Sequence, residues 1–230
     1  MRKIPAELLR EMAAALSPED AAEMAIPSYL HRRRLMRGMA WWRVELLAQR
    51  LERAAGRHRD LTIVDFGCGS GVLFEEASLV SERIYGVDIV LKAAEILVER
   101  WGLSKVVLLT PDQAAERIPE GTVDIILAGE VLEHVEPLEP TLKLFKRWLD
   151  PEHGSLLVTL PTESALYRLG RKLAGFSGHY HHSNARSIDE EIREAGFSRG
   201  HVRKIPLGGP FAIYWCADYA PATSSVATGR

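Results

Sequence analysis

The sequence predicts an α/β protein with a doubly wound, mainly parallel sheet of seven strands and an N-terminal helical cap. Helical patterning fills roughly the first sixty residues, and short apolar runs then alternate with helix-like stretches. Two final strand-like runs are joined by the turn-forming segment 206–210. Because alternating strands and helices build parallel sheets with right-handed crossovers, we expect the middle of the chain to form the sheet.

The helical cap is assigned to residues 1–58. Ser17-Pro18-Glu19-Asp20 combines a capping serine, a proline at the first helical position and acids in the first turn, which predicts a helix start. A longer amphipathic segment covers about 28–55. Its Trp41 and Trp42 are interpreted as packing residues that dock this helix on the core, with an aromatic lid over an apolar or ring-containing ligand as the alternative.

The sheet domain is assigned to residues 59–220. The expected strands are 61–66, 83–87, 106–109, 123–128, 155–160, 198–205 and 212–219. The expected helices are 71–80, 90–101, 112–117, 138–149, 163–174 and one that begins with a capping box at Ser187 and ends near Gly196. Residues 161–184 are interpreted as an insertion on the substrate side, and 221–230 as a disordered tail.

Composition narrows the class of protein. The 230 residues carry a net charge of −2, which gives no global basic field of the kind that marks a general nucleic-acid binder. The chain has no apolar run long enough to cross a bilayer, and its charged start lacks a signal-peptide core. Cys68 and Cys216 are the two cysteines, consistent with a reducing compartment. The expected location is the cytoplasm, and a homo-oligomer is left open.

The most informative stretch is TIVDFGCGSGV at 62–72, a buried strand that ends in Asp65 and is followed by Gly67, Gly69 and Gly71. Glycine lets the backbone turn sharply and lets a ligand approach main-chain N–H groups. Such a loop between a strand and a helix is where α/β proteins hold nucleotides and related cofactors. A dinucleotide loop reads GxGxxG, and here the third glycine comes one residue early. The spacing therefore argues against an NAD-dependent oxidoreductase.

Asp88 ends the next strand in the sequence GVD. A carboxylate at this place can accept hydrogen bonds from both ribose hydroxyls of an adenosine. This acid alone fits NAD as well as any other adenosine cofactor, so the glycine spacing decides between them.

Together VDFGCGSG, GVD, the polar Asp112 after the third strand and DIILAGEVLEHV resemble the class I S-adenosylmethionine-dependent methyltransferases, which have a Rossmann-like fold. The resemblance is to the small-molecule type that includes the ubiquinone-biosynthesis O-methyltransferases. It covers 61–160, and AGF at 195–197 fits that family's closing hairpin, which implies an antiparallel C-terminal strand. It implies direct in-line transfer of a methyl group from S-adenosylmethionine to a small molecule, at oxygen, with S-adenosylhomocysteine as the product.

The resemblance also implies a cofactor site. Asp88 would hold the ribose hydroxyls, Ile89 would lie against the adenine, and Asp112 would reach the adenine amino group. Asp112 is equally interpreted as a helix N-cap. The full implied set is Asp65, Phe66, Gly67, Cys68, Gly69, Gly71, Asp88, Ile89, Asp112, Gln113, Gly129, Glu130 and Val131, with the last three on the sulfonium side.

Glu130, Glu133 and His134 fall at i, i+3 and i+4, which is one helix face if this turn is helical. With His182 they resemble the metal ligands of the small-RNA 2′-O-methyltransferases, which implies a divalent ion such as Mg²⁺. The alternative makes Glu133 and His134 residues that only line the pocket. His134 or His181 is the candidate general base that removes the acceptor's proton.

Basic clusters suggest an anionic acceptor. One cluster is His31, Arg32, Arg33, Arg34 and Arg37, and the other is Arg168, Arg171 and Lys172. The first is interpreted as a solvated face, with recruitment of a phosphate-bearing or membrane-surface substrate as the alternative. Two rival functions are kept: an RNA 2′-O-methyltransferase and a non-catalytic partner subunit that binds S-adenosylmethionine. The slight net acidity and the absence of an RNA-binding module argue against nucleic acid as the partner.

Overall fold

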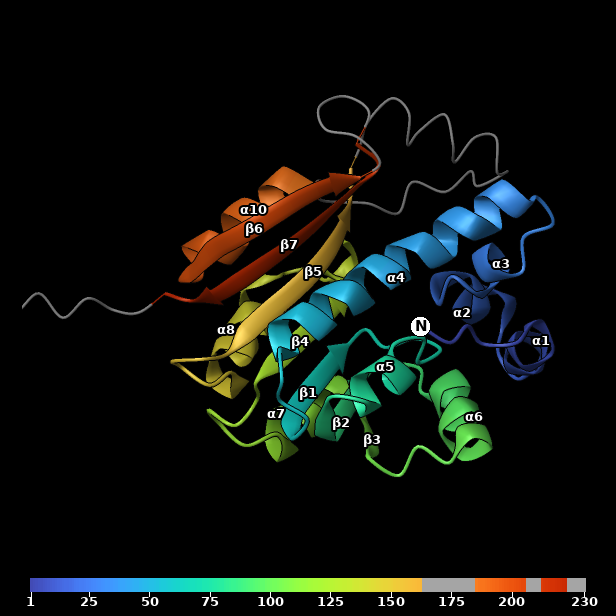
Figure 1. Cartoon of the computed structure of the whole chain (residues 1–230), viewed down its shortest axis with the longest axis horizontal. Helices are drawn as coiled ribbons and strands as arrows, with labels where there is room; N and C mark the ends of the chain where they lie inside the picture. Colours follow the sequence, from blue (N-terminus) through green and yellow to red (C-terminus); the bar gives the residue numbers. More distant parts are fainter. Residues whose placement is uncertain (163–184, 206–211, 223–230) are drawn as a thin grey trace, which may run out of the picture.

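A seven-stranded sheet with the order β3-β2-β1-β4-β5-β7-β6 forms the centre of the protein (Figure 1). The computed structural model describes residues 1–162, 185–205 and 212–222. The strands are β1 (Leu61–Phe66), β2 (Ser81–Val87), β3 (Val106–Leu109), β4 (Ile125–Gly129), β5 (Ser155–Pro161), β6 (Phe197–Ile205) and β7 (Tyr214–Pro221). Strands β1 to β5 pair in parallel, and β7 is antiparallel to β5 and β6. The predicted fold class is confirmed.

The strand order reverses between β1 and β4, because the chain moves outward from β1 through β2 to β3 and then returns to β4. In open α/β sheets, ligands bind at such a switch point, beyond the carboxyl ends of the strands. The topology therefore places the ends of β1, β2 and β4 where a cofactor is expected.

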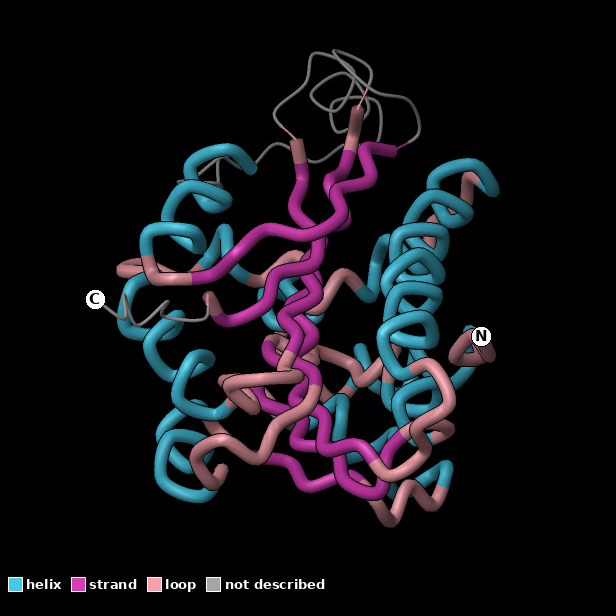
Figure 2. The backbone as a smooth tube through the Cα atoms, turned by 60° about the vertical axis from the view of Figure 1, so that its left-hand side comes forward, coloured by secondary structure: helices cyan, strands magenta, loops and turns pink. Residues whose placement is uncertain are grey.

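Helices cover both faces of the sheet, as Figure 2 shows with the strands seen between two helical layers. One hydrophobic cluster joins the sheet to the N-terminal helices, and a second joins its other face to the later helices. The first layer contains α1 (Ala6–Ala14), α3 (Ile26–Tyr29), α4 (Arg34–Ala55), α5 (Phe74–Ser78) and α6 (Lys92–Trp101), and the second α7 (Pro111–Arg117), the 3₁₀ turn η1 (Leu132–His134), α8 (Glu139–Trp148) and α10 (Ala185–Glu194). None of the described helices has both the length and the apolar content needed to cross a bilayer.

Helix α2 (Pro18–Glu23) begins where the sequence predicts. The Oγ of its N-cap residue Ser17 accepts a hydrogen bond of 3.0 Å from the Asp20 N–H. The expected segment 28–55 is broken, since α3 ends at Tyr29 and α4 begins at Arg34. Trp41 is buried, with its ring centroid 4.5 Å from that of Tyr29. The packing role predicted for Trp41 is confirmed.

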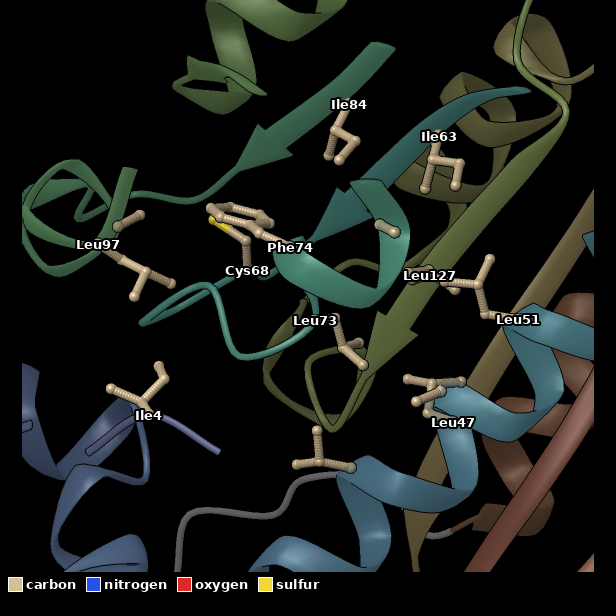
Figure 3. Close-up of a cluster of buried hydrophobic side chains, with 14 of the residues drawn as sticks. Ile4, Leu47, Leu51, Ile63, Cys68, Leu73, Phe74, Ile84, Leu97 and Leu127 are labelled. Atoms are coloured by element: carbon tan, nitrogen blue, oxygen red, sulfur yellow. The ribbon is translucent and has the colours of Figure 1, made fainter. Parts of the chain in front are cut away.

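Figure 3 shows the core beneath the glycine loop, where Phe74 of α5, Leu97 of α6 and Leu47 of α4 point toward the sheet residues between them. All three side chains are at most 2% exposed. The predicted helix 71–80 is shortened to α5, because Gly71 adopts a φ of +74° that a helix does not allow. This tightly packed layer fixes the loop that precedes α5.

Several other boundaries differ from the prediction by one or two residues, among them the starts of β2, β4, β7, α6 and α10 and the end of β7. α10 begins at Ala185, two residues before the expected capping box, since Ala185 and Ile188 both pack into the core. β7 continues to Pro221, which shortens the expected tail. The expected helix 163–174 and the rest of the insertion lie outside the described residues, as does 223–230.

Candidate functional site

A cavity of about 720 Å³ lies at the carboxyl ends of β1, β2 and β4, beneath the N-terminal cap. It is walled by the sheet loops on one side and by helices α2, α3 and α4 on the other. The sheet side contributes 65–70, 87–90, 129–131 and 133–135, and the cap contributes Met24, Ser28, Tyr29, Arg43 and Leu47. Its volume suits a cofactor-sized ligand.

The glycine loop has a backbone conformation that residues with a side chain rarely adopt. Gly67, Gly69 and Gly71 have φ values of +71°, +51° and +74°. A Cβ on Gly67 would lie 2.4 Å from Cγ2 of Val131, so the loop and the end of β4 approach too closely for any side chain. Gly71 lies outside the cavity lining, and its lack of a side chain makes room for the Phe74 ring.

Asp88 joins the end of β2 to the glycine loop. Its Oδ2 accepts a hydrogen bond of 2.8 Å from the Gly69 N–H, and its Oδ1 accepts one of 3.2 Å from the Val90 N–H. Ile89 is 73% exposed and lines the cavity beside it. An apolar side chain so exposed next to a fixed carboxylate is the arrangement predicted for adenine and ribose.

Arg43 of α4 lies in the cavity wall and forms an ion pair with Glu130, which follows β4. Its guanidinium carbon also lies 5.9 Å from the Tyr29 ring centroid and 6.0 Å from that of Tyr214. Burial alone would lower the pKa of Arg43, but Glu130, Tyr29 and Tyr214 together outweigh burial and raise it. Glu130 has a φ of +55°, a strained conformation of the kind that clusters at functional sites.

Arg43 is absent from the set of site residues predicted from the sequence. One signal was present, because Arg43 falls one helical turn before the buried Leu47 and thus on the apolar face of α4. A cation on a buried helix face needs a partner. The sequence does not reveal which carboxylate supplies it.

Glu133 is 3% exposed, and His134 is exposed at the end of η1. Burial, followed by the charge of Glu130, raises the pKa of Glu133 to about 8. Glu130 lies outside the 3₁₀ turn, so the predicted helical face that would carry all three residues is not formed. In the described part of the chain no group of three His, Cys, Asp or Glu side chains could hold a metal ion. The metal hypothesis therefore has no support in these residues, and His182 and His181 lie outside them.

The comparisons with known proteins identify the family. A family model described as a methyltransferase domain matches residues 42–201, which is well over half of the chain. The chain belongs to this methyltransferase family. It is 26% identical over 171 residues to the mitochondrial ubiquinone biosynthesis O-methyltransferase of Mus musculus, which covers 67% of this chain and 46% of that protein. The chain thus spans about half the length of the curated relatives it matches.

Solved structures share the fold. The magnesium protoporphyrin IX methyltransferase of Synechocystis PCC 6803 with bound S-adenosylhomocysteine superposes with a TM-score of 0.61 at 17% identity, over 94% of both chains. A structure described as the [4+2]-cyclase SpnF gives 0.59 at 18% identity, over 77% of this chain and 80% of that one. The methyltransferase has the class I fold, which different chemistries can use.

Most residues predicted to hold the cofactor line the methyltransferase cavity together. These are Asp65, Phe66, Gly67, Cys68, Gly69, Asp88, Ile89, Gly129, Glu130 and Val131. Asp112 and Gln113 do not line it. The N-cap of α7 is Thr110 rather than Asp112, and the Gln113 side chain accepts a hydrogen bond of 3.0 Å from the Thr110 N–H in a capping box. The N-cap interpretation of Asp112 is therefore wrong, and Gln113 is held by its own helix.

Replacing Gly67 with alanine is expected to destabilise the methyltransferase by about 2–4 kcal/mol, because the positive φ costs about 1–2 kcal/mol and the overlap with Val131 adds a similar amount. Urea unfolding checks this. Gly102→Ala is the matched control, since Gly102 has a φ of +61° but open space around it. This variant should lose only about 1–2 kcal/mol, the cost of the positive φ. Equal losses in the two variants would show that Val131 yields freely.

Asp65 should make the ligand-free methyltransferase less stable as the pH rises. Burial, with the charge of Asp88 in second place, raises the pKa of Asp65 from 3.8 to about 7. Between those values the unfolded chain has lost this proton and the folded chain keeps it, so stability falls with pH by about 1.4 kcal/mol per unit. Asp65→Asn should therefore gain stability relative to wild type between pH 4 and pH 8, by a few kcal/mol in urea unfolding.

The exposed Asp112→Asn serves as the control for the loss of one acidic charge, and its difference from wild type should change little over this range. An Asp65→Asn variant whose stability difference from wild type is constant between pH 4 and pH 8 would contradict the expected titration.

Proposed function

We propose that this methyltransferase transfers the methyl group of S-adenosylmethionine to a small-molecule acceptor, at oxygen, by direct in-line transfer. One observation carries the proposal. Ser70 Oγ, Glu130 Oε1 and Glu133 Oε2 are buried with no hydrogen-bond partner in the described structure, and all three residues line the same cavity. Burying such atoms without partners costs free energy, so a polar ligand that pairs with them explains their position.

The residues present fit the cofactor. Asp88 suits the two ribose hydroxyls, and Ile89 suits the adenine ring. The methionine end of the cofactor carries an ammonium and a carboxylate. Arg43 offers a cation for the carboxylate, and the free Oε1 of Glu130 offers an acceptor for the ammonium.

The bound cofactor supplies an activated methyl group, so the protein's task is to align the acceptor and exclude water. Cap residues Tyr29 and Met24 cover the cavity opposite the glycine loop and would shield it from solvent. His134 lines the cavity and is our candidate for the base that takes the acceptor's proton at a ring nitrogen.

Transfer to oxygen is proposed because the curated relatives are named O-methyltransferases. The anionic acceptor expected from the basic clusters gains no support from the cavity, because Arg43 pairs with Glu130 and is assigned to the cofactor's carboxylate. The other charged residues of the described lining are acidic: Asp20, Glu23, Asp65, Asp88 and Glu133. The basic residues Arg168, Arg171 and Lys172 lie outside the described part of the chain and add nothing to this argument.

Calorimetry with S-adenosylhomocysteine and with NADH tests the cofactor. We expect S-adenosylhomocysteine to bind and NADH not to bind. The reverse result would favour an NAD-dependent oxidoreductase. A methyl-release assay with phenols, catechols and hydroxy acids then tests the reaction.

A cofactor-binding protein that transfers no methyl group is the second candidate, because the fold neighbour SpnF is named a cyclase. Tight S-adenosylhomocysteine binding without methyl release to any acceptor would favour this candidate.

A further inference from the structure

The start of α4 carries a concentrated positive charge that the cavity does not use. Residues 24–44 contain five arginines and no acidic residue, in a chain whose net charge is −2. Arg32, Arg33 and Arg34 are consecutive and exposed, and none of them lines the cavity. We call Arg32, Arg33, Arg34 and the adjoining Leu35 the basic-apolar tip.

The charge lies at an unfavourable place on the helix. α4 has no acidic residue in its first turn, and its N-cap residue Arg33 makes no side-chain capping hydrogen bond. The positive end of the helix dipole lies at this terminus, so cations there oppose helix formation by some tenths of a kcal/mol each. The arginines therefore lower the stability of the helix start at which they lie.

Leu35 adds an apolar group in the middle of this charge. It is 74% exposed, the highest value among the large exposed hydrophobic residues of the described chain. A single exposed leucine is ordinary, but one next to three exposed arginines matches surfaces that bind at a lipid–water interface.

A second basic segment lies at the same side of the molecule. Residues 195–217 contain no acidic residue, and β6 ends with the exposed Arg203 and Lys204. In both Figure 1 and Figure 2 the start of α4 and the end of β6 lie at the upper side, and α4 projects to the periphery there. The positive charge therefore extends beyond the tip over one side of the protein.

We propose that the basic-apolar tip docks this protein on an anionic lipid bilayer. Arginines near such a surface are attracted by its negative potential, and the leucine inserts between the headgroups. The phosphates of a nucleic acid would pair with the arginines but offer no apolar contact to Leu35, so the observations favour a lipid surface. Since α3 and α4 also supply Ser28, Tyr29 and Arg43 to the cavity, docking through the tip would hold the cavity close to the bilayer.

Co-sedimentation of the full chain with vesicles tests the proposal, using phosphatidylcholine alone and phosphatidylcholine mixed with phosphatidylglycerol. We expect binding to the anionic vesicles only, weakened at high salt. Replacing Arg32, Arg33 and Arg34 together with glutamine should weaken binding roughly 100-fold, at about five-fold per arginine. Leu35→Ala should weaken it about ten-fold, because less apolar area enters the interface.

The matched control replaces Arg53, Arg57 and Arg59 with glutamine, which removes the same charge from the other end of α4 and just beyond it. It should bind the vesicles at least ten-fold more tightly than the tip variant. Thermal melting verifies that both triple variants fold, and the tip variant should melt no lower than wild type.

Three results would overturn the proposal. The first is no binding of wild type to anionic vesicles, and the second is an equal loss in the tip and control variants. The third is binding to an RNA homopolymer that needs the three arginines but not Leu35, with no vesicle binding, which would assign the tip to nucleic acid.

Discussion

Asp88→Asn is expected to weaken S-adenosylhomocysteine binding by about 100-fold or more. The carboxylate is proposed to accept two charge-assisted hydrogen bonds from the ribose, each worth about 1.5–3 kcal/mol, and an amide can accept through one oxygen only. The substitution also weakens the link to the glycine loop, because Asp88 Oδ2 accepts from the Gly69 N–H. Isothermal titration calorimetry at low salt measures the change directly.

The control for this variant is Asp112→Asn, which alters an exposed acid in the first turn of α7 that does not line the cavity. Its affinity for S-adenosylhomocysteine should stay within about two-fold of wild type, since surface charges away from a site contribute little. If Asp112→Asn caused the larger loss, the adenosine would have to extend over α7, and the placement derived from the cavity would be wrong.

Replacing Arg43 with methionine should destabilise the fold by about 3–5 kcal/mol at pH 7. The variant keeps an unbranched apolar side chain but leaves the mostly buried Glu130 carboxylate without its partner cation. Urea unfolding measures the loss. Arg100→Met is the matched control, because its ion pair with Glu11 is exposed and should contribute less than about 1 kcal/mol.

A double variant separates pairing from folding. Arg43→Met combined with Glu130→Gln removes both charges, so most of the lost stability should return, as the coupling term of a double-mutant cycle. Affinity for S-adenosylhomocysteine should not return, whereas affinity for 5′-methylthioadenosine, which lacks the amino acid end, should be nearly unchanged. Equal effects on the two ligands would mean that Arg43 and Glu130 do not face the methionine end.

The sequence predicted the elements whose signal is local. The three glycines that follow β1 predict a sharp turn through residues 67–71, because only glycine adopts those φ values readily. The alternation of apolar strands with helices was enough to predict the parallel sheet. A strand that is buried on both faces reads as a continuous apolar run, which can be recognised without knowing the strands beside it. The glycine spacing and Asp88 likewise predicted residues that the structure brings together in one cavity.

Boundaries and caps were predicted less well, because neighbouring residues compete for them. Thr110 rather than Asp112 caps α7, since Thr110 is the residue followed by proline at the first helical position and by Gln113 at the third. Glu130 left the expected helical face because close packing of Gly67 against Val131 holds this turn in place, with Glu130 at a positive φ. The miss at α7 was a choice between neighbouring residues, whereas the miss at Glu130 reflects a contact between segments that the local sequence does not encode.

By itself, the sequence determined the class of fold and the glycine loop that lines the cavity, because both depend on residues close together in the chain. Only the tertiary structure decided what completes the site. Arg43 and Glu130 are 87 positions apart and meet because α4 packs across β4 and β5. The partner of a buried charge is chosen by packing over long sequence separations, so no local pattern identifies it. The same packing leaves the basic-apolar tip of α4 exposed at the periphery, which the string RRRL alone does not reveal.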